Sequence, residues 1–372
     1  MQTGKDIVHQ DLSSMCSRLE QELKVMSGHK LLITGGAGFL GYYLVQVIDH
    51  WNQEYKPSAK IGLTIYDNMV RGKPEWLSQL ENRKAIKLLT HDIRHPLPSD
   101  MDDDFSFIIH AASIASPTFY RKHPIETMDA NVNGLRRLLE YCKKQKEDGR
   151  TTPLGFLFYS SSEVYGDPAA DQIPTSESYN GNVSFTGPRA CYDESKRFGE
   201  TLCVNFAQRH ELPIKIVRPF NNYGPGLKIS DRRVIPDFAR NIFDNENIVM
   251  LSDGKPTRTF CYVADAVVGY YKALVSGRPG QAYNIGTETP EISMAELAKQ
   301  ITVYAKELFG YGGKVILKIS EEDEYLVDNP NRRCPRIDKA RSELGFVPVI
   351  GLEEGLKRSL LWYADNRQSE DA

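Results

Sequence analysis

The amino-acid sequence predicts an α/β fold, a doubly wound parallel sheet followed by a smaller, discontinuous C-terminal lobe. Apolar segments of strand length alternate with segments of helical length between residues 30 and 220. Strands that are apolar throughout and separated by helices are typical of a parallel sheet covered on both faces. After about residue 222 the pattern breaks into short mixed elements. This change predicts a second unit that closes over a ligand.

The first 28 residues precede the first predicted strand and have the pattern of an amphipathic helix. The apolar positions near helical spacing are Ile7, Leu12, Met15, Leu19, Leu23 and Met26. We expect a helical extension packed on the main domain, and a partner-binding arm is the alternative. The segment has no apolar signal core, so we do not expect a secretory peptide.

Strands and helices alternate regularly in the central part of the chain. The predicted strands span 30–35, 61–67, 85–91, 105–113, 154–162 and 213–220. The predicted helices span 39–51, 74–82, 125–147 and 189–210. Residues 167–188 are polar and contain glycine and proline, which indicates a loop.

Composition excludes several classes of protein. The 372 residues are 41% apolar, which suits one large domain or a large and a small one. A net charge of −3 gives no strong field toward nucleic acid or an acidic membrane, and no apolar run is long enough to span a bilayer. The six cysteines form no C-x-x-C pair and no zinc spacing with histidine, so we expect reduced thiols, a cytoplasmic protein and no metal.

A glycine-rich turn follows the first predicted strand. In "TGGAGFLG", Gly35, Gly38 and Gly41 allow a tight turn and a close approach of the backbone to a pyrophosphate at a helix N-terminus. Asp67 ends the second strand, where a carboxylate binds a ribose diol and repels a 2′-phosphate. These residues predict NAD rather than NADP, and an ordinary strand–helix turn is the alternative. Asp92, after the third strand, is expected either to meet the adenine or to cap a turn.

A tyrosine and a lysine lie four residues apart in "CYDESK". On a helix, Tyr192 and Lys196 share a face. An ammonium group beside a phenol favours the phenolate, which lowers the pKa of the phenol. Tyr192 is therefore a candidate base for a hydroxyl group during hydride transfer. The Tyr-x-x-x-Lys motif alone is weak evidence for a catalytic pair. It becomes stronger evidence because it follows the glycine turn and "SSSEVYG" in this order.

These motifs together resemble the extended short-chain dehydrogenase/reductases that act on nucleotide sugars. The chain is most similar to the UDP-glucuronate decarboxylases, or UDP-xylose synthases, over about residues 29 to 365. The matching stretches are "TGGAGFLG", "HAASIASPTFY", "SSSEVYGDP", "GPRACYDESKR", "RPFNNYGPG", "TRTFCYVAD" and "DNPNRRCPRIDKARSELGF". The resemblance implies a Rossmann-type domain with a small sugar-nucleotide lobe and NAD that is regenerated in each cycle.

The resemblance also suggests a division into domains. Residues 1–28 are the helical extension, and 29–222 form the NAD-binding Rossmann domain. Part of 260–290 is expected to return to that domain. Residues 223–372 form mainly the sugar-nucleotide lobe.

Carried over residue by residue, the resemblance implies three groups of site residues. The expected catalytic residues are Tyr192, Lys196, Ser161, Ser162, Glu163 and Arg258. The expected NAD contacts are Gly35, Gly38, Phe39, Leu40, Gly41, Asp67, Asn68, Asp92, Ile93, Ala111, Ala112, Ser113, Asn131, Tyr192 and Lys196. The expected substrate contacts are Ser116, Tyr120, Asn221, Arg233, Arg258 and Arg333.

Glu163 helps to separate the reactions that this scaffold supports. A 4,6-dehydratase must expel water and commonly has an aspartic acid at the place of Ser162, whereas a 4-epimerase needs no carboxylic residue at Glu163. A decarboxylase oxidises C4 of a uronate, loses carbon dioxide from the β-keto acid and reprotonates C5. Glu163 with Ser162 favours this third reaction: Glu163 works on C5, and Arg258 donates to the enolate or the carboxylate. The alternatives are a dehydratase or an epimerase, and more remotely a non-catalytic NAD-binding regulatory protein.

The resemblance further implies a homodimer. In this family the helices that correspond to 125–147 and 189–210 form a four-helix interface. Apolar residues that look exposed in these two segments are Leu138, Leu139, Tyr141, Phe198 and Leu202. Core packing is the alternative explanation for these residues.

Overall fold

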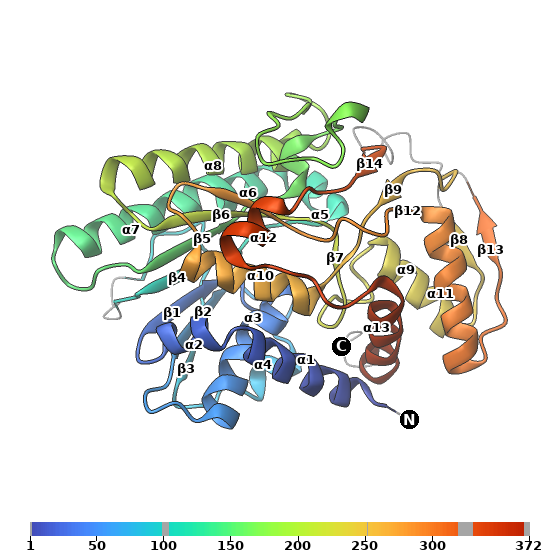
Figure 1. The fold of residues 1–372 in the computed structure, drawn as a ribbon, viewed down its shortest axis with the longest axis horizontal. Helices are drawn as coiled ribbons and strands as arrows, with labels where there is room; N and C mark the ends of the chain where they lie inside the picture. Colours follow the sequence, from blue (N-terminus) through green and yellow to red (C-terminus); the bar gives the residue numbers. More distant parts are fainter. Residues whose placement is uncertain (1, 99–103, 251, 319–329, 368–372) are drawn as a thin grey trace.

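A parallel sheet lies at the centre of the fold (Figure 1). The computed structural model describes residues 2–98, 104–250, 252–318 and 330–367. Within these ranges seven strands pair side by side in the order β11-β6-β5-β4-β1-β2-β3, all in parallel. They are β1 (Lys30–Thr34), β2 (Gly62–Asp67), β3 (Ile86–Thr90), β4 (Phe107–His110), β5 (Gly155–Tyr159), β6 (Ile214–Pro219) and β11 (Ala282–Ile285).

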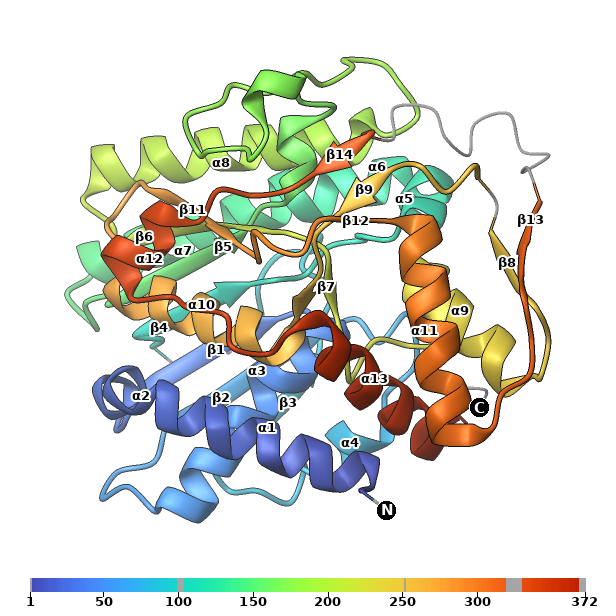
Figure 2. The same cartoon turned by 45° about the vertical axis from the view of Figure 1, so that its right-hand side comes forward.

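Helices cover both faces of the sheet (Figures 1 and 2). They include α3 (Phe39–His50), α7 (Leu135–Glu147), α8 (Ala190–His210) and α10 (Val263–Ser276). Successive strand residues point to opposite faces: Leu31 and Ile33 pack in the core with α3 and α10, and Leu32 packs in the core with α7 and α8. Both faces of the inner strands are buried, which explains why these strands are mostly apolar. The predicted fold class is confirmed.

The predicted helices differ from the structure in two places. The segment predicted as one helix over 125–147 is a continuous run of α6 (Pro124–Met128), a π-helical segment η2 (Asp129–Gly134) and α7. The helix predicted over 74–82 is only the single turn α4 (Glu75–Ser78). Leu77 and Leu80 are its buried aliphatic residues, and so small an apolar face does not stabilise a longer helix.

The N-terminal extension packs on the main core. It forms α1 (Gly4–Arg18) and α2 (Glu20–Met26), and all six apolar positions that predicted it are buried. On the inner face of α1 the carboxylate of Asp11 accepts hydrogen bonds of 2.6 Å from the hydroxyls of Tyr43 and Tyr262 and pairs with Arg358. The extension is therefore anchored by polar as well as apolar contacts and is not a free arm.

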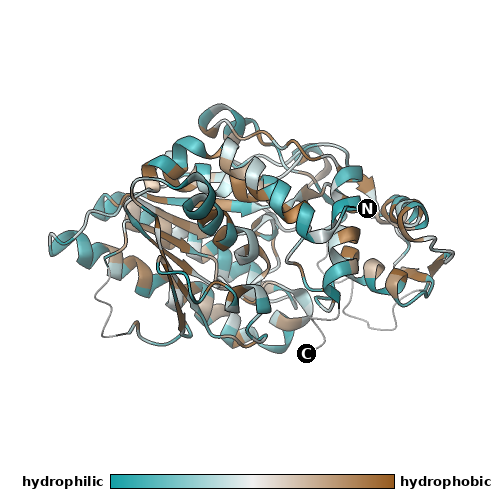
Figure 3. Ribbon diagram, turned by 90° about the horizontal axis from the view of Figure 1, so that it is seen from below, coloured by the Kyte–Doolittle hydropathy of each residue, from teal (hydrophilic) through white to brown (hydrophobic). Residues whose placement is uncertain are grey.

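The elements after β6 form the C-terminal part of the fold, except that β11 joins the central sheet and α10 packs against it. They are α9 (Val234–Phe243), β7 (Asn222–Tyr223), β8 (Ile248–Met250), β9 (Thr257–Arg258), β10 (Cys261–Tyr262), β12 (Ile292–Ser293), α11 (Met294–Phe309), β13 (Val315–Leu317), β14 (Arg332–Arg333), α12 (Asp338–Leu344) and α13 (Leu352–Asn366). Figure 3 shows apolar sheet strands enclosed by helices with hydrophilic outer faces. The first two residues of the stretch "DNPNRRCPRI" lie outside the described residues.

Two further observations concern membrane-spanning helices and cysteines. In the described part of the chain, no helix has both the length and the hydropathy needed to cross a membrane. The six cysteines, all of which lie within that part, are free thiols.

Candidate active site

A cavity of about 2010 Å³ opens at the carboxyl ends of the sheet strands. Ligands bind at this edge in doubly wound folds. The predicted site residues that line the cavity are Gly35, Gly38, Phe39, Leu40, Gly41, Asp67, Asn68, Asp92, Ile93, Ala111, Ala112, Ser113, Ser116, Ser161, Ser162, Glu163, Tyr192, Lys196, Asn221, Arg233, Arg258 and Arg333. The fold thus gathers residues from distant segments around one space.

The glycine turn makes one end of the cavity a backbone cradle. Gly35 has φ +75°, and a Cβ there would lie 2.6 Å from the Cα of Ala112. A Cβ on Gly41 would lie 2.1 Å from the carbonyl oxygen of Gly36. Larger residues therefore do not fit, and the N-terminus of α3 directly behind the turn offers free N–H groups to an anion.

Asp67 lies beside this cradle at the end of β2. Its carboxylate accepts hydrogen bonds from the backbone N–H of Ala37 at 3.0 Å and of Met69 at 2.9 Å. Burial raises its pKa. Asp92 on the neighbouring loop accepts from Asn68 at 3.0 Å, and its hydrogen bonds with Arg94 are the main cause of a lowered pKa. Both carboxylates face the cavity, where a ribose diol finds acceptors.

Tyr192 and Lys196 lie on α8 and are both buried. The Lys196 Nζ lies 5.7 Å from the centre of the Tyr192 ring and donates to the carbonyl oxygen of Tyr159 at 2.8 Å. Burial raises the pKa of Tyr192 to about 12, although its hydrogen bond with Ser161 acts in the opposite direction. Burial also lowers the pKa of Lys196 to about 7. The pKa of Tyr192 is therefore raised in the protein alone, the reverse of the predicted lowering, because desolvation is the largest cause of the shift.

Glu163 is the centre of an ionic cluster at the other end of the cavity. It lies in a 3₁₀ turn, η3 (Ser162–Tyr165), which begins after Ser161 because the Ser161 hydroxyl accepts from the Glu163 backbone N–H at 3.2 Å. One carboxylate oxygen of Glu163 pairs with Nη2 of Arg189 and with Nη2 of Arg333, each at 2.6 Å. Burial pushes the pKa of Glu163 upward, but Arg189, Arg333 and Arg258 outweigh it and hold the pKa at about 2.

Arg189 is the site residue that the sequence reasoning missed. It lines the cavity as the residue before the first turn of α8, and its side chain is only 9% exposed. Its Nε lies 3.9 Å from a carboxylate oxygen of Asp193, and its guanidinium lies over the Tyr120 ring. Its position three residues before Tyr192, in "PRACY", is the one signal that places it near the site.

The remaining substrate-side residues form the far wall. The hydroxyl of Ser116 donates to the carbonyl oxygen of Asp231 at 3.2 Å, and the side chain of Asp231 pairs with Arg233 at 2.9 Å. The amide of Asn221 donates to the carbonyl oxygen of Thr259 at 2.8 Å. The guanidinium of Arg258 donates to backbone carbonyl oxygens, including that of Thr257 at 2.8 Å, and burial lowers its pKa to about 9.

Comparison with known proteins identifies the family. A family model described as the NAD dependent epimerase/dehydratase family matches residues 31–286. UDP-glucuronic acid decarboxylase 6 of Arabidopsis thaliana is 35% identical over 342 residues, which make up 92% of this chain and 91% of the relative. UDP-glucuronic acid decarboxylase 1 of Xenopus tropicalis is 34% identical over 334 residues, 90% of this chain and 72% of the relative. The chain belongs to the NAD dependent epimerase/dehydratase family.

Solved structures agree with this family fold. An epimerase of Methanothermobacter thermautotrophicus superposes with a TM-score of 0.78 at 25% identity, covering 96% of this chain and 98% of that one. The UDP-glucuronic acid 4-epimerase of Bacillus cereus, solved with UDP-glucuronic acid and NAD, superposes with a TM-score of 0.72 at 23% identity, covering 90% of this chain and 99% of that one.

NAD is the cofactor of this member of the NAD dependent epimerase/dehydratase family. The residues of the chain fit the group: the close backbone packing at Gly35 and Gly41 allows the tight turn that would hold a pyrophosphate, and Asp67 would offer its carboxylate to a ribose. A 2′-phosphate would bring negative charge against that carboxylate, which favours NAD over NADP.

Two of the predicted contacts lie behind the cavity wall of this family member. Tyr120 is buried and stacks on Tyr192, with ring centres 5.1 Å apart and an interplanar angle of 11°. Asn131 is buried in η2 and donates to the Ser195 hydroxyl at 2.9 Å. Neither is among the described residues that line the cavity, so the ligand contacts expected of Tyr120 and Asn131 stay predictions. The sequence cannot distinguish residues that line the cavity from residues that lie behind them, because both kinds come from the same motifs.

Proposed function

We propose that the protein is an NAD-dependent UDP-glucuronate decarboxylase, which converts UDP-glucuronate to UDP-xylose through a 4-keto sugar and the loss of carbon dioxide. The observation that carries this proposal is the charge at the sugar end of the cavity. Among the described residues, the guanidinium groups of Arg189, Arg258 and Arg333 act on the carboxylate of Glu163, and Asp193 places a second carboxylate beside Arg189. Over these five groups the net charge is three minus two, or +1. A uronate carboxylate is the sugar substituent that such a site favours.

The first step acts on the 4-hydroxyl of the sugar. Tyr192 takes the proton of this hydroxyl, and the Ser161 hydroxyl orients it. NAD, when bound, would supply hydride transfer from and back to C4, and its oxidised form would add a positive charge that favours the tyrosinate. Lys196 lies on the same side of Tyr192 and adds a second positive charge when protonated.

The second step loses carbon dioxide from the 4-keto uronate. Arg258 and Arg333 face the developing enolate and stabilise its negative charge. Glu163 stays ionised near neutral pH because its pKa is about 2, so it accepts hydrogen bonds and does not donate protons. It therefore serves best as the acceptor that positions a water, which gives a proton to C5 and regains one from solvent.

Neither Glu163 nor Ser162 offers the acid that a 4,6-dehydratase needs. Expulsion of water needs an acid close to the leaving group, and a carboxyl group with a pKa of about 2 is a poor acid at neutral pH. Ser162, at the neighbouring position, is a weaker acid still. Decarboxylation needs no such acid, because carbon dioxide leaves without a proton.

The deciding experiment incubates the purified protein with UDP-glucuronate and NAD and follows carbon dioxide release and product mass. A product lighter by the mass of carbon dioxide supports the proposal. An unchanged mass with a galacturonate product would establish a 4-epimerase and contradict the role of Glu163. Without reaction, the uridine, thymidine, cytidine and guanosine diphosphate hexoses are screened for loss of water, and a product lighter by water would establish a dehydratase.

We also propose that the protein is a cytoplasmic homodimer with the domain division given above. Support for the dimer comes from exposed apolar residues on α6 and α8: Ile125 is 61% exposed, and Phe198 is 51% exposed. Leu138 and Leu139, expected at the same surface, are fully buried against the sheet, so that part of the expectation is wrong. Support for the cytoplasm is limited to the free thiols.

A further inference from the structure

A buried ion pair lies next to the catalytic segment and has no part in the reaction described above. Glu200 of α8 and Arg218 of β6 form two parallel hydrogen bonds, from Nε to Oε1 at 2.8 Å and from Nη2 to Oε2 at 2.6 Å. Their side chains are 13% and 12% exposed. Burial alone would lower the pKa of Arg218, but Glu200 outweighs it and raises that pKa.

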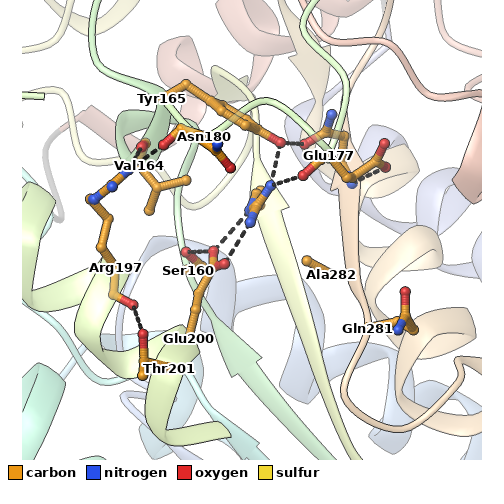
Figure 4. Close-up of polar contacts among 12 residues, drawn as sticks. Ser160, Val164, Tyr165, Glu177, Asn180, Arg197, Glu200, Thr201, Gln281 and Ala282 are labelled. Carbon is orange, nitrogen blue, oxygen red and sulfur yellow. Dashed lines mark hydrogen bonds and ion pairs between the residues drawn. The ribbon is translucent and has the colours of Figure 1, made fainter. Parts of the chain in front are cut away.

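The pair holds the residues on both sides of Ser161 and Glu163. The Ser160 hydroxyl donates to Oε1 of Glu200 at 2.5 Å. Nη1 of Arg218 donates to the Tyr165 hydroxyl at 2.6 Å. Figure 4 shows this arrangement, with Ser160 next to Glu200 on one side and Tyr165 and Glu177 on the other.

Further contacts complete the frame around this segment. Tyr165 donates to Oδ1 of Asn284 on β11 at 2.8 Å, and Arg218 Nη1 donates to the carbonyl oxygen of Glu177 at 3.0 Å. Arg197 of α8 donates to the carbonyl oxygens of Val164 and Asn180, each at 2.8 Å. The loop after the 3₁₀ turn, β6, β11 and α8 are thereby joined around one guanidinium and one carboxylate.

We propose that Glu200 and Arg218 are positioning residues, which set the Ser161 hydroxyl and the Glu163 carboxylate in register with Tyr192. The proposal rests on the roles proposed above for Ser161 and Glu163. Glu200 lies one helical turn after Lys196 and two turns after Tyr192, so the same helix that carries the base also fixes the segment that it works with. An ion pair this buried contributes little net stability compared with an apolar replacement. Positioning of the neighbouring catalytic segment is therefore a better explanation for the Glu200–Arg218 pair than stability.

The test compares four variants with the wild type. Glu200→Gln keeps the size of the side chain and an acceptor for Ser160 but weakens the two-bond pair. Arg218→Lys keeps the positive charge but loses the two parallel hydrogen bonds to Glu200, and Arg218→Met loses both the charge and the hydrogen bonds. Glu194→Gln is the matched control on the same helix: its contact with Nε of Arg197 is long, at 3.6 Å with each side chain 36% exposed, so the hydrogen bonds from Arg197 Nη1 to Val164 and Asn180 remain.

We expect kcat for UDP-glucuronate, measured per bound NAD, to fall about 100-fold in Glu200→Gln and Arg218→Met, because a displacement of about 1 Å of reacting groups has an effect of this size. KM should change less than about threefold, Arg218→Lys should recover part of the loss, and Glu194→Gln should match the wild type. If the ion pair only stabilises the fold, the Glu200 and Arg218 variants should have a lower melting temperature and a smaller fraction of folded protein. Their kcat per bound NAD would be unchanged, and that result would overturn the proposal.

Separate outcomes distinguish this inference from the proposed reaction. If the wild type releases no carbon dioxide, the proposed reaction fails. The variants are then compared by the rate at which any oxidisable nucleotide sugar reduces their bound NAD, seen by absorbance. The same 100-fold loss in that rate supports the positioning role, and equal rates overturn it. A wild type whose NAD no nucleotide sugar reduces would overturn both. If Arg218→Met does not fold, Glu200→Gln and Arg218→Lys carry the comparison.

Discussion

Arg333 donates a hydrogen bond of 2.6 Å to the carboxylate of Glu163, a residue 170 positions away in the sequence. The two side chains are 12% and 14% exposed, so water screens the pair little. Arg189 shares the same carboxylate oxygen at 2.6 Å. One carboxylate therefore joins three segments around the sugar end of the cavity: the turn after β5, the start of α8, and β14.

Replacing Glu163 should destabilise the fold. Glu163→Gln leaves the guanidiniums of Arg189 and Arg333 buried without their counter-charge, and removal of one partner of a buried pair costs about 3 kcal/mol. We expect the free energy of unfolding in urea to fall by about that amount. Glu194→Gln, which breaks a half-exposed pair, should lower it by about 0.5 kcal/mol or less. If both variants lower the free energy of unfolding equally, water solvates the ion pairs of Glu163 and these pairs do not stabilise the fold by that amount.

The same carboxylate makes stability depend on pH in a defined window. The folded-state pKa of Glu163 is about 2, below its ordinary value of 4.5, so the ionised group stabilises the fold above about pH 5 and loses this effect as pH falls toward 2. The difference in unfolding free energy between wild type and Glu163→Gln should therefore be constant from pH 7 to about 5 and shrink below about 4.5. The measurement is a urea titration at several pH values. A difference that stays constant down to pH 3 would contradict the lowered pKa.

Removal of the Tyr192 hydroxyl should stop the reaction and spare the cofactor. Tyr192→Phe keeps the ring that stacks on Tyr120 and loses the base, whose contribution is about 10²- to 10⁴-fold in rate. We expect kcat to fall by that factor while the NAD content of the purified protein is unchanged. Tyr120→Phe is the matched control, because the Tyr120 hydroxyl is buried without a hydrogen-bond partner among the described residues. A large loss of activity in Tyr120→Phe would instead support the predicted contact of Tyr120 with the sugar.

The fold and the cofactor end could be predicted from sequence because their signals are local. Apolar strands, the glycines of "TGGAGFLG" and the acid at the end of β2 each have meaning within a few residues. The pairing of Tyr192 with Lys196 follows from helical spacing in the same way. The predicted domain division stays a prediction, although β11 does pair with β6 in the central sheet.

The ion pairs at the sugar end of the cavity could not be predicted, because they join segments that are far apart in the sequence. Arg189 and Arg333 meet at Glu163 only when α8 and β14 are folded beside the turn after β5. The raised pKa of Tyr192 depends on burial by the surrounding chain, which the four-residue spacing to Lys196 does not reveal. Sequence reasoning therefore found which residues gather at the site but not which of them are already paired.

A single methyl group in the glycine cradle should weaken NAD binding. Gly41→Ala places a Cβ 2.1 Å from the carbonyl oxygen of Gly36. The turn must then shift, at a cost of roughly 1–3 kcal/mol to the fold, and its N–H groups move away from the position of the pyrophosphate. We expect the dissociation constant for NAD to rise at least about tenfold, measured by calorimetry on the cofactor-free protein. Gly351→Ala makes the same change where nothing lies within 4 Å, and it should bind NAD like the wild type. Normal NAD affinity in Gly41→Ala would place the pyrophosphate elsewhere.

A charge on the outer face of α8 should separate the proposed dimer. Phe198 is 51% exposed on this helix, and Phe198→Glu would place a carboxylate in the middle of the proposed four-helix interface, where an unpaired buried charge is unfavourable. We expect the wild type to have the mass of a dimer by light scattering and Phe198→Glu to have the mass of a monomer at micromolar concentration. Val303→Glu is the control, because Val303 is similarly exposed, at 53%, on α11 of the C-terminal part. If Val303→Glu dissociates the dimer and Phe198→Glu does not, the copies meet through the C-terminal part instead of α6 and α8.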